Sequence, residues 1–271
     1  MIDRVSLPGT NFDVSRLSFG TASLHHLYSS RARQALLQGA LDIGITHFDT
    51  SPYYGYGLAE QELGILQKRN RDAFTVATKV GLYPNGSRFS GTLTVWARKI
   101  IGKAFPAISM PVVNWSVSAA EKSLELSLKR LKTEYVDILF LHEPNPGVVN
   151  ADEFLLWLEA QKSKGKVRNF GLAGHSGPME NWLKKKHPIA TVLQIKDSFN
   201  QREADTVLKY NRDFQITYGY LSSLKDGSDY HTKGNLLMQA LQRNRTGSVL
   251  FSTRRLERIT MLSKKFQLES L

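Results

Sequence analysis

The sequence has 271 residues, 41% of them apolar, a composition that is ordinary for a globular protein with a substantial core. It contains no cysteine, which excludes disulfides and thiolate chemistry and favours a reducing, cytoplasmic location. The formal charge of +12 comes from basic clusters in separate segments, so we do not expect a nucleic-acid partner. No apolar run is long enough to span a membrane, so we do not expect a membrane partner either.

Short apolar strands alternate with amphipathic helices along the chain. In the first half, periodicity and turn residues predict, in order, a hairpin over 4–13, a strand over 17–20, a helix over 31–43, a strand over 45–48, a helix over 58–67 and a strand over 74–80. A long connection, 81–115, follows this third strand, and its middle part, 93–105, has the pattern of a short helix. Connections of this length are often functional lids.

The same alternation continues through the second half. The predicted elements there are helices over 119–131, 151–162, 179–185, 203–210, 236–243 and 256–266, and strands over 135–142, 167–172, 190–195, 214–218 and 248–251. Strict alternation implies parallel strands joined by right-handed crossovers, and eight such units imply a single α/β domain, a (β/α)8 TIM barrel over residues 1–271. An open doubly wound sheet would instead need a Gly-x-Gly-x-x-Gly turn after the first strand, where this chain has Gly20-Thr21-Ala22-Ser23.

Four polar residues stand at or near the carboxyl ends of neighbouring strands. Asp49 closes the second strand, Tyr54 lies in the turn behind it, and Lys79 and His142 close the third and fourth strands. Singly, each has a structural explanation, as a helix cap, a packed ring, an exposed ammonium or a core histidine. Together they are harder to explain in this way, because a buried lysine needs a carboxylate partner and Asp49 lies on the neighbouring strand. We therefore predict an active site at this end of the barrel.

The chemistry of these side chains suits carbonyl reduction. A phenol has an ordinary pKa of about 10, so a nearby ammonium, held by Asp49, is expected to lower the pKa of Tyr54 and make it a better proton donor. His142 would orient or polarise the carbonyl oxygen. The sequence shows no metal-ligand cluster and no side-chain nucleophile, and no side chain supplies a hydride, so a nicotinamide cofactor is implied.

These residues lie in motifs that resemble those of the aldo-keto reductase family, and the similarity extends along almost the whole chain. FDTSPYYG resembles the family's Asp-Thr-Ala-x-x-Tyr-Gly signature, VATKVG its lysine strand and VDILFLHEP its histidine strand. The resemblance implies hydride transfer from a nicotinamide, bound across the barrel mouth, to an aldehyde or ketone. It makes Tyr54 the proton donor, assigns Lys79 and Asp49 to tuning its pKa, and assigns His142 to orienting the carbonyl.

The resemblance also indicates where the cofactor binds. Gln194 matches the residue that binds the carboxamide, and Tyr218 matches the aromatic residue on which the nicotinamide stacks. The segment 252–259, STRRLERI, resembles the segment that binds the 2′-phosphate, which favours NADPH over NADH through Arg254 and Arg258, although both are also compatible with ordinary surface arginines. The other cofactor-binding residues that the resemblance implies are Gly20, Thr21, Asp49, Leu221, Ser252 and Thr253.

Three segments depart from the family pattern. Ala173-Gly174 stands where the family usually has Ser-Asn, Leu250-Phe251-Ser252 where it has Ile-Pro-Gly, and Met261-Leu262 where it has a Glu-Asn pair. The lost hydrogen bonds are expected to weaken cofactor binding, or to make it depend more on the arginines. None of the departures touches the four catalytic positions.

The end of the sequence bears on how open the site is. The sequence stops soon after the eighth predicted helix, without the long C-terminal loop with which many relatives close the substrate pocket. We therefore expect an open site covered mainly by 81–115, with Trp96, Phe105 and Trp115 as candidate pocket aromatics, some of which are expected only to pack beneath this connection.

Two kinds of function remain open. The leading hypothesis is an NADPH-dependent reductase of aldehydes or ketones, or a sugar or polyol dehydrogenase if it works in the reverse direction. The alternative is a cofactor-binding regulatory subunit of the same fold, like the channel-associated members of the family, which would not need Tyr54. The sequence leaves the substrate, the direction and the oligomeric state undetermined.

Overall fold

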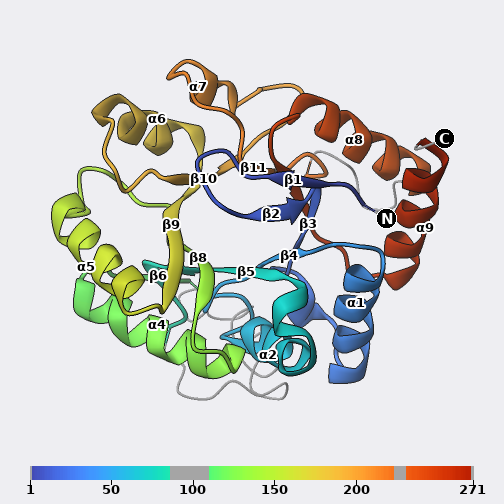
Figure 1. Ribbon diagram of the computed structural model, residues 1–271, viewed down its shortest axis with the longest axis horizontal. Helices are drawn as coiled ribbons and strands as arrows, with labels where there is room; N and C mark the ends of the chain where they lie inside the picture. Colours follow the sequence, from blue (N-terminus) through green and yellow to red (C-terminus); the bar gives the residue numbers. More distant parts are fainter. Residues whose placement is uncertain (1, 86–109, 223–229, 270–271) are drawn as a thin grey trace.

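Eight parallel strands close into a barrel in the computed structural model, which describes residues 2–85, 110–222 and 230–269. Around the barrel they run in the order β3 (Leu17–Gly20), β4 (His47–Asp49), β5 (Thr75–Val80), β8 (Val136–His142), β9 (Val167–Gly174), β10 (Val192–Lys196), β11 (Ile216–Tyr218) and β12 (Ser248–Phe251). Pairing of β12 with β3 closes the ring, with Val249 opposite Leu17. The predicted (β/α)8 barrel is confirmed (Figure 1).

The helices lie around the outside of this barrel (Figure 1). They are α1 (Ser30–Asp42), α2 (Leu58–Asn70), α4 (Val117–Leu131), α5 (Ala151–Ser163), α6 (Ser176–Lys185), α7 (Asp205–Leu208), α8 (Tyr230–Arg243) and α9 (Leu256–Glu269). Side-chain caps explain where several begin: Ser29, Ser116 and Asn150 accept backbone N–H groups at the starts of α1, α4 and α5. Of the helices that are described, none combines the length and the apolar character needed to traverse a membrane.

A short hairpin covers one end of the barrel. β1 (Arg4–Ser6) and β2 (Asp13–Ser15) pair antiparallel and lie across the barrel in the view of Figure 1, which confirms the predicted N-terminal hairpin. Leu7 and Val14 are buried against apolar side chains from five of the strands. A larger apolar cluster packs the strands against the helices. Because this end is closed, the opposite end, where the strands reach their carboxyl termini, is left for a site.

The second barrel strand begins later than predicted. It covers His47–Asp49 rather than 45–48, so Asp49 is part of the strand. The N–H of Ile45 bonds to the carbonyl of Ala40 at the end of α1, 3.1 Å away, and the backbone N–H of Thr46 donates to the Ser15 hydroxyl at 2.8 Å. The backbone N–H groups of both residues therefore bond outside the barrel sheet, although the carbonyl of Thr46 still accepts the N–H of Thr75 at 2.9 Å.

Other boundaries also differ from the predictions. The predicted helix 203–210 is only the single turn α7, β9 continues two residues beyond 172 to Gly174, and α8 begins at Tyr230 rather than at 236. The predicted helix 93–105 lies outside the described residues. The longer β9 matters for function, because it carries Ala173 and Gly174 to the carboxyl end of the barrel.

The two ends of the connection after β5 pair with each other, which the sequence pattern did not predict. β6 (Leu82–Tyr83) and β7 (Val112–Val113) form a two-stranded antiparallel sheet. Gly81 precedes it with a φ of +106°, and a Cβ there would lie 2.1 Å from the Trp115 ring. Trp115 also packs edge-on against Phe154, with ring centroids 6.1 Å apart.

A buried carboxylate ties the first residues of β8 to its surroundings. Asp137 is fully buried and accepts the backbone N–H of Val76 at 2.8 Å. It also pairs with Arg71 at 2.9 Å and with Arg168 at 3.0 Å. These interactions compensate a charge that would otherwise be costly to bury.

A histidine is buried at the start of β4. His47 is fully buried, and its Nδ1 lies 2.7 Å from the hydroxyl of Thr75. Burial, and secondly the charge of Lys79, lower the pKa of His47 to about 3. The imidazole is therefore neutral in the folded protein at physiological pH.

Candidate active site

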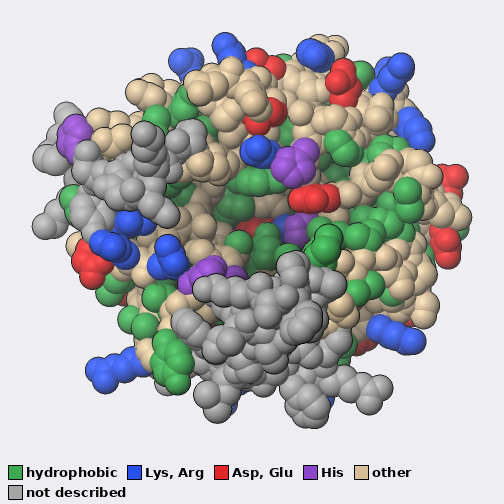
Figure 2. Space-filling model, turned by 180° about the vertical axis from the view of Figure 1, so that it is seen from behind, with side chains coloured by type: hydrophobic (Ala, Val, Ile, Leu, Met, Phe, Trp, Pro, Cys, Tyr) green, Lys and Arg blue, Asp and Glu red, His purple; other side chains and the backbone are tan. Residues whose placement is uncertain are grey.

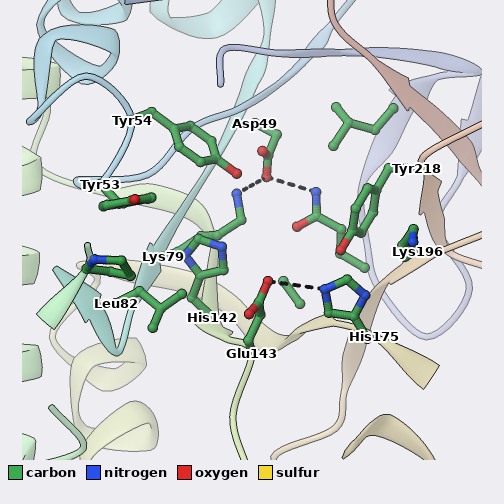
Figure 3. A pocket seen from close by; sticks show the side chains of 14 residues that line it. Asp49, Tyr53, Tyr54, Lys79, Leu82, His142, Glu143, His175, Lys196 and Tyr218 are labelled. Atoms are coloured by element: carbon green, nitrogen blue, oxygen red, sulfur yellow. Dashed lines mark hydrogen bonds and ion pairs between the residues drawn. The ribbon is translucent and has the colours of Figure 1, made fainter. Parts of the chain in front are cut away.

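The carboxyl ends of three neighbouring strands bring Asp49, Lys79 and His142 together. They line a cavity of about 470 Å³ together with Tyr54, which the turn before α2 supplies (Figure 3). Figure 2 shows the corresponding hollow, with acidic and histidine side chains inside it and at its edge. The four residues predicted to be catalytic thus share one cavity.

The turn that carries Tyr54 depends on backbone geometry that glycine favours. Gly55 and Gly57 have φ values of +60° and +85°, in the left-handed region. A Cβ on Gly55 would lie 2.5 Å from the Cβ of His25. The Gly-rich sequence after Tyr54 therefore permits the tight path that presents its ring to the cavity.

Asp49 and Lys79 form the expected buried ion pair. Lys79 Nζ donates to Asp49 Oδ1 at 2.6 Å and to the carbonyl of Thr50 at 2.9 Å. Both residues are 2% exposed. Burial lowers the pKa of Lys79, and the charge of Asp49 opposes this shift by favouring the ammonium. The carboxylate therefore holds the ammonium in place, as predicted.

The Tyr54 ring lies close to both Lys79 and His142. Lys79 Nζ is 4.9 Å from the centroid of the Tyr54 ring, and the ring of His142 is perpendicular to it at 6.2 Å. The expectation of a lowered phenol pKa is wrong for this structure. Burial first, and then the charges of Asp49 and Glu143, raise the pKa of Tyr54 well above 10. The phenol is thus fully protonated at neutral pH, as a proton donor must be before it acts.

His142 is a neutral imidazole at this site. Burial, followed by the charges of Lys79 and His175, lowers the pKa of His142 well below its ordinary value of 6.5. Its Nδ1 is buried and has no hydrogen-bond partner among the described residues. A neutral imidazole beside the phenol can donate a hydrogen bond to a carbonyl oxygen without competing as an acid.

Two predicted cofactor-binding residues form the opposite wall. Gln194 Nε2 donates to Asp49 Oδ1 at 2.9 Å, and its buried Oε1 has no partner in the part of the chain that is described. Tyr218 closes β11, lines the cavity and donates to the carbonyl of Gly174 at 3.4 Å. An unpaired amide oxygen beside an aromatic ring fits the carboxamide and ring of a nicotinamide.

The remaining predicted cofactor contacts lie away from this cavity. Thr21 is fully buried, and its N–H and hydroxyl both donate to the carbonyl of Asp49 at 2.9 Å, so it positions the end of β4. The others that do not line the cavity are Gly20, Leu221, Ser252, Thr253, Arg254 and Arg258. Arg254 is exposed and Arg258 partly exposed at the start of α9, beyond β12.

Eight residues of the cavity wall were not predicted to touch a ligand. They are Tyr53, Leu82, Pro111, Glu143, Ala173, His175, Lys196 and Leu250. Three of them are ionisable and follow a strand end or a predicted site residue: Glu143 comes after His142, Lys196 two residues after Gln194, and His175 after the Ala173-Gly174 pair. That position in the chain was the available signal.

The prediction for the pocket aromatics is wrong at Trp115. Its ring packs on Gly81 and Phe154, whereas Leu82 and Pro111 line this side of the cavity. Trp96 and Phe105 lie outside the described residues. Among the described residues of the connection after β5, Leu82 and Pro111 line the cavity.

Known proteins share both the sequence and the fold. L-galactose dehydrogenase of Arabidopsis thaliana is 30% identical over 200 residues, covering 70% of this chain and 54% of the relative. Aldo-keto reductase AKR11C1 from Bacillus halodurans (holo form) superposes with a TM-score of 0.76 at 18% identity, covering 98% of this chain and 91% of that structure. An aldo-keto reductase from Klebsiella pneumoniae in complex with NADPH superposes with a TM-score of 0.70 at 18% identity, covering 98% and 90%.

The sequence also matches a family model over most of its length. The chain spans about half to three fifths of the length of the first curated relatives that it matches, between 54% and 62%. A sequence model described as the Aldo/keto reductase family matches residues 16–234, a range that includes Asp49, Tyr54, Lys79 and His142. The chain therefore belongs to the aldo/keto reductase family.

Proposed function

We propose that the protein is an NADPH-dependent oxidoreductase that reduces an aldehyde or ketone to an alcohol, or catalyses the reverse reaction. The observation that carries this proposal is the shared cavity in which a protonated Tyr54, the Asp49–Lys79 pair and a neutral His142 face the unpaired Oε1 of Gln194. Tyr54 provides a proton donor and His142 a hydrogen-bond donor for a developing alkoxide, next to a binding site for a nicotinamide.

Each residue has a distinct role in this reaction. The bound nicotinamide supplies the hydride, and Tyr54 donates the proton to the carbonyl oxygen. His142 orients that oxygen through a hydrogen bond. Lys79 stabilises the phenolate that remains once the proton has left, because its ammonium lies 4.9 Å from the ring, and Asp49 keeps the ammonium charged and in place.

The cofactor would be held by residues on both sides of the Asp49 carboxylate. Gln194 would accept the carboxamide N–H, and Tyr218 would stack on the ring. Thr21 would act indirectly through Asp49. For the remainder of the cofactor we propose contacts from Gly20, Leu221, Ser252 and Thr253, with Arg254 and Arg258 at the 2′-phosphate, since a guanidinium binds phosphate through two hydrogen bonds.

The substrate is a small molecule, and the protein works in the cytoplasm as one catalytic domain. The relative named L-galactose dehydrogenase supports a sugar or polyol as one substrate class and oxidation as one direction. The Klebsiella complex supports NADPH as the cofactor. The lack of cysteine fits a reducing compartment.

The test is a fluorescence titration of the purified protein with NADPH and, separately, with NADH, followed by an assay of NADPH consumption with simple aldehydes. The proposal predicts tighter binding of NADPH and aldehyde-dependent oxidation. If neither nucleotide binds, the changes at Ala173-Gly174 and Met261-Leu262 have abolished the cofactor site, and a regulatory or interaction role replaces the enzyme.

A further inference from the structure

Glu143 places a carboxylate on the cavity wall directly beside His142 (Figure 3). Its backbone is left-handed, with a φ of +57°, which is uncommon for a residue other than glycine. Its N–H donates to the carbonyl of Ala173 at 2.7 Å, and a Cβ on Gly174 would lie 3.3 Å from its Cα. The small residues at 173–174 thus leave room for the turn that presents Glu143 to the cavity.

His175 lies beside Glu143 on the same wall. Its Nε2 is 3.4 Å from Glu143 Oε1, the contact drawn dashed in Figure 3. The two side chains are 51% and 47% exposed, so both remain accessible to a ligand in the cavity. Carboxylate oxygens accept hydrogen bonds, and an imidazole can either donate or accept them. Together they form a polar patch suited to a hydroxyl group.

Glu143 also gives this wall an electrostatic character. The charge of Asp49 is matched by Lys79, whereas the imidazole that faces Glu143 carries charge only when it is protonated. Lys196, also on the wall, lies 3.7 Å from its own carboxylate partner, Glu203. The effect of Glu143 extends to the reacting group, since its charge contributes, after burial and Asp49, to the raised pKa of Tyr54.

We propose that Glu143 and His175 are the specificity-determining pair of this cavity, binding a hydroxyl group of a neutral hydroxycarbonyl substrate and disfavouring carbonyl compounds that carry a carboxylate. This inference rests on the proposed reductase function and deepens it. A substrate without the hydroxyl binds less well because Glu143 and His175 then lack a hydrogen-bond partner on the ligand. A substrate with a carboxylate is disfavoured because it brings a second negative charge close to Glu143.

The test compares matched aldehydes as substrates of the enzyme supplied with NADPH. Glyceraldehyde differs from propanal by two hydroxyls, and succinic semialdehyde differs from butanal by a carboxylate. In Glu143→Ala, the kcat/KM of glyceraldehyde relative to propanal should fall about tenfold, as expected for a lost hydrogen bond to a charged group. In Glu143→Gln, which retains a hydrogen-bond acceptor, that ratio should largely persist. Because the negative charge is removed, the kcat/KM of succinic semialdehyde relative to butanal should rise about tenfold.

His175→Asn should lower the glyceraldehyde preference in the same direction as Glu143→Ala. A matched control is Asp152→Asn, which removes an exposed carboxylate paired with His187 at 3.2 Å, away from the cavity. It should change neither ratio. Unchanged ratios in both Glu143 variants would overturn the proposal. The proposal would also be overturned if the Glu143 variants bound NADPH more weakly and lost kcat/KM equally with all four aldehydes. Glu143 and His175 would then belong to the cofactor site.

The underlying function is tested separately by wild-type protein. If it binds NADPH and turns over none of the aldehydes, the reductase proposal fails. Selectivity is then decided by saturation-transfer NMR of glycerol and 1-propanol on the complex with NADP+. Stronger binding of glycerol by wild type, lost in Glu143→Ala, supports the pair as a hydroxyl site, and equal binding of the two alcohols contradicts it.

Discussion

Replacing Asp49 with asparagine should destabilise the protein in a manner that depends on pH. Asparagine has the same shape and can still accept from Gln194 Nε2, but it leaves Lys79 buried without a counterion. Breaking such a pair costs about 3–5 kcal/mol when the remaining charge stays buried. The alternative for Lys79 is to lose its proton, which costs about 4.6 kcal/mol at pH 7 but about 1.9 kcal/mol at pH 9, taking an unfolded pKa of about 10.4.

The sign of this dependence follows from proton binding. In the variant, the folded state with neutral Lys79 binds one proton fewer than the unfolded state, so raising the pH towards the unfolded pKa recovers stability. We therefore predict a loss of about 3–5 kcal/mol at pH 7 that shrinks to about 2 kcal/mol at pH 9. In wild type the charge of Asp49 opposes the lowering of the Lys79 pKa, so the same pH dependence is weaker.

Urea unfolding of wild type and Asp49→Asn at the two pH values measures the effect. Asp72→Asn, an exposed acid in the short helix Arg71–Ala73, is the control for loss of a surface charge. The double variant with Lys79→Met removes the buried charge and should abolish the pH dependence. A loss below about 1 kcal/mol, or one equal at both pH values, would refute the argument that Asp49 holds a buried ammonium.

Three further predictions concern other parts of the molecule. The pKa of about 3 for His47 lies below its unfolded value of about 6.5, so the free energy of unfolding falls as the pH drops below about 6.5. Between pH 8 and pH 5, urea unfolding should show that His47→Asn loses about 2 kcal/mol less stability than wild type. Asp137→Asn should cost about 2–4 kcal/mol by urea unfolding, because Arg71 loses a buried carboxylate; a cost below about 1 kcal/mol would contradict the ion-pair account. Arg258→Ala should weaken NADPH binding about tenfold in the fluorescence titration and leave NADH unchanged, and equal losses would remove the 2′-phosphate assignment.

Much of the fold could be predicted because its information is local. Apolar strands and amphipathic helices each show their periodicity within a few residues, and their strict alternation leaves few topologies. The boundaries that were missed depend on distant contacts. The backbone N–H of Thr46 donates to the hydroxyl of Ser15, 31 residues earlier in the chain, and Gly81 accommodates the ring of Trp115 at the far end of the long connection. Such contacts have no signature in the flanking sequence.

That the candidate site residues share one cavity could be predicted for a related reason. Residues at the carboxyl ends of adjacent parallel strands must meet, so Asp49, Lys79 and His142 were brought together by topology alone. Glu143 was not found, because the direction of its side chain follows from a left-handed backbone conformation that the sequence does not reveal. The direction of the Tyr54 pKa shift was missed as well, since the motif does not show the burial that is the main cause of the raised pKa.

We propose that Tyr54 donates the proton during carbonyl reduction in this cavity. Its most direct test is a single-turnover measurement of NADPH oxidation by wild type and Tyr54→Phe with the same aldehyde, with NADPH affinity measured in parallel. Phenylalanine keeps the ring beside Lys79 and His142 and removes only the hydroxyl. The account predicts a rate lower by about 10²–10⁴-fold with NADPH affinity preserved. Equal rates in the two proteins would contradict it.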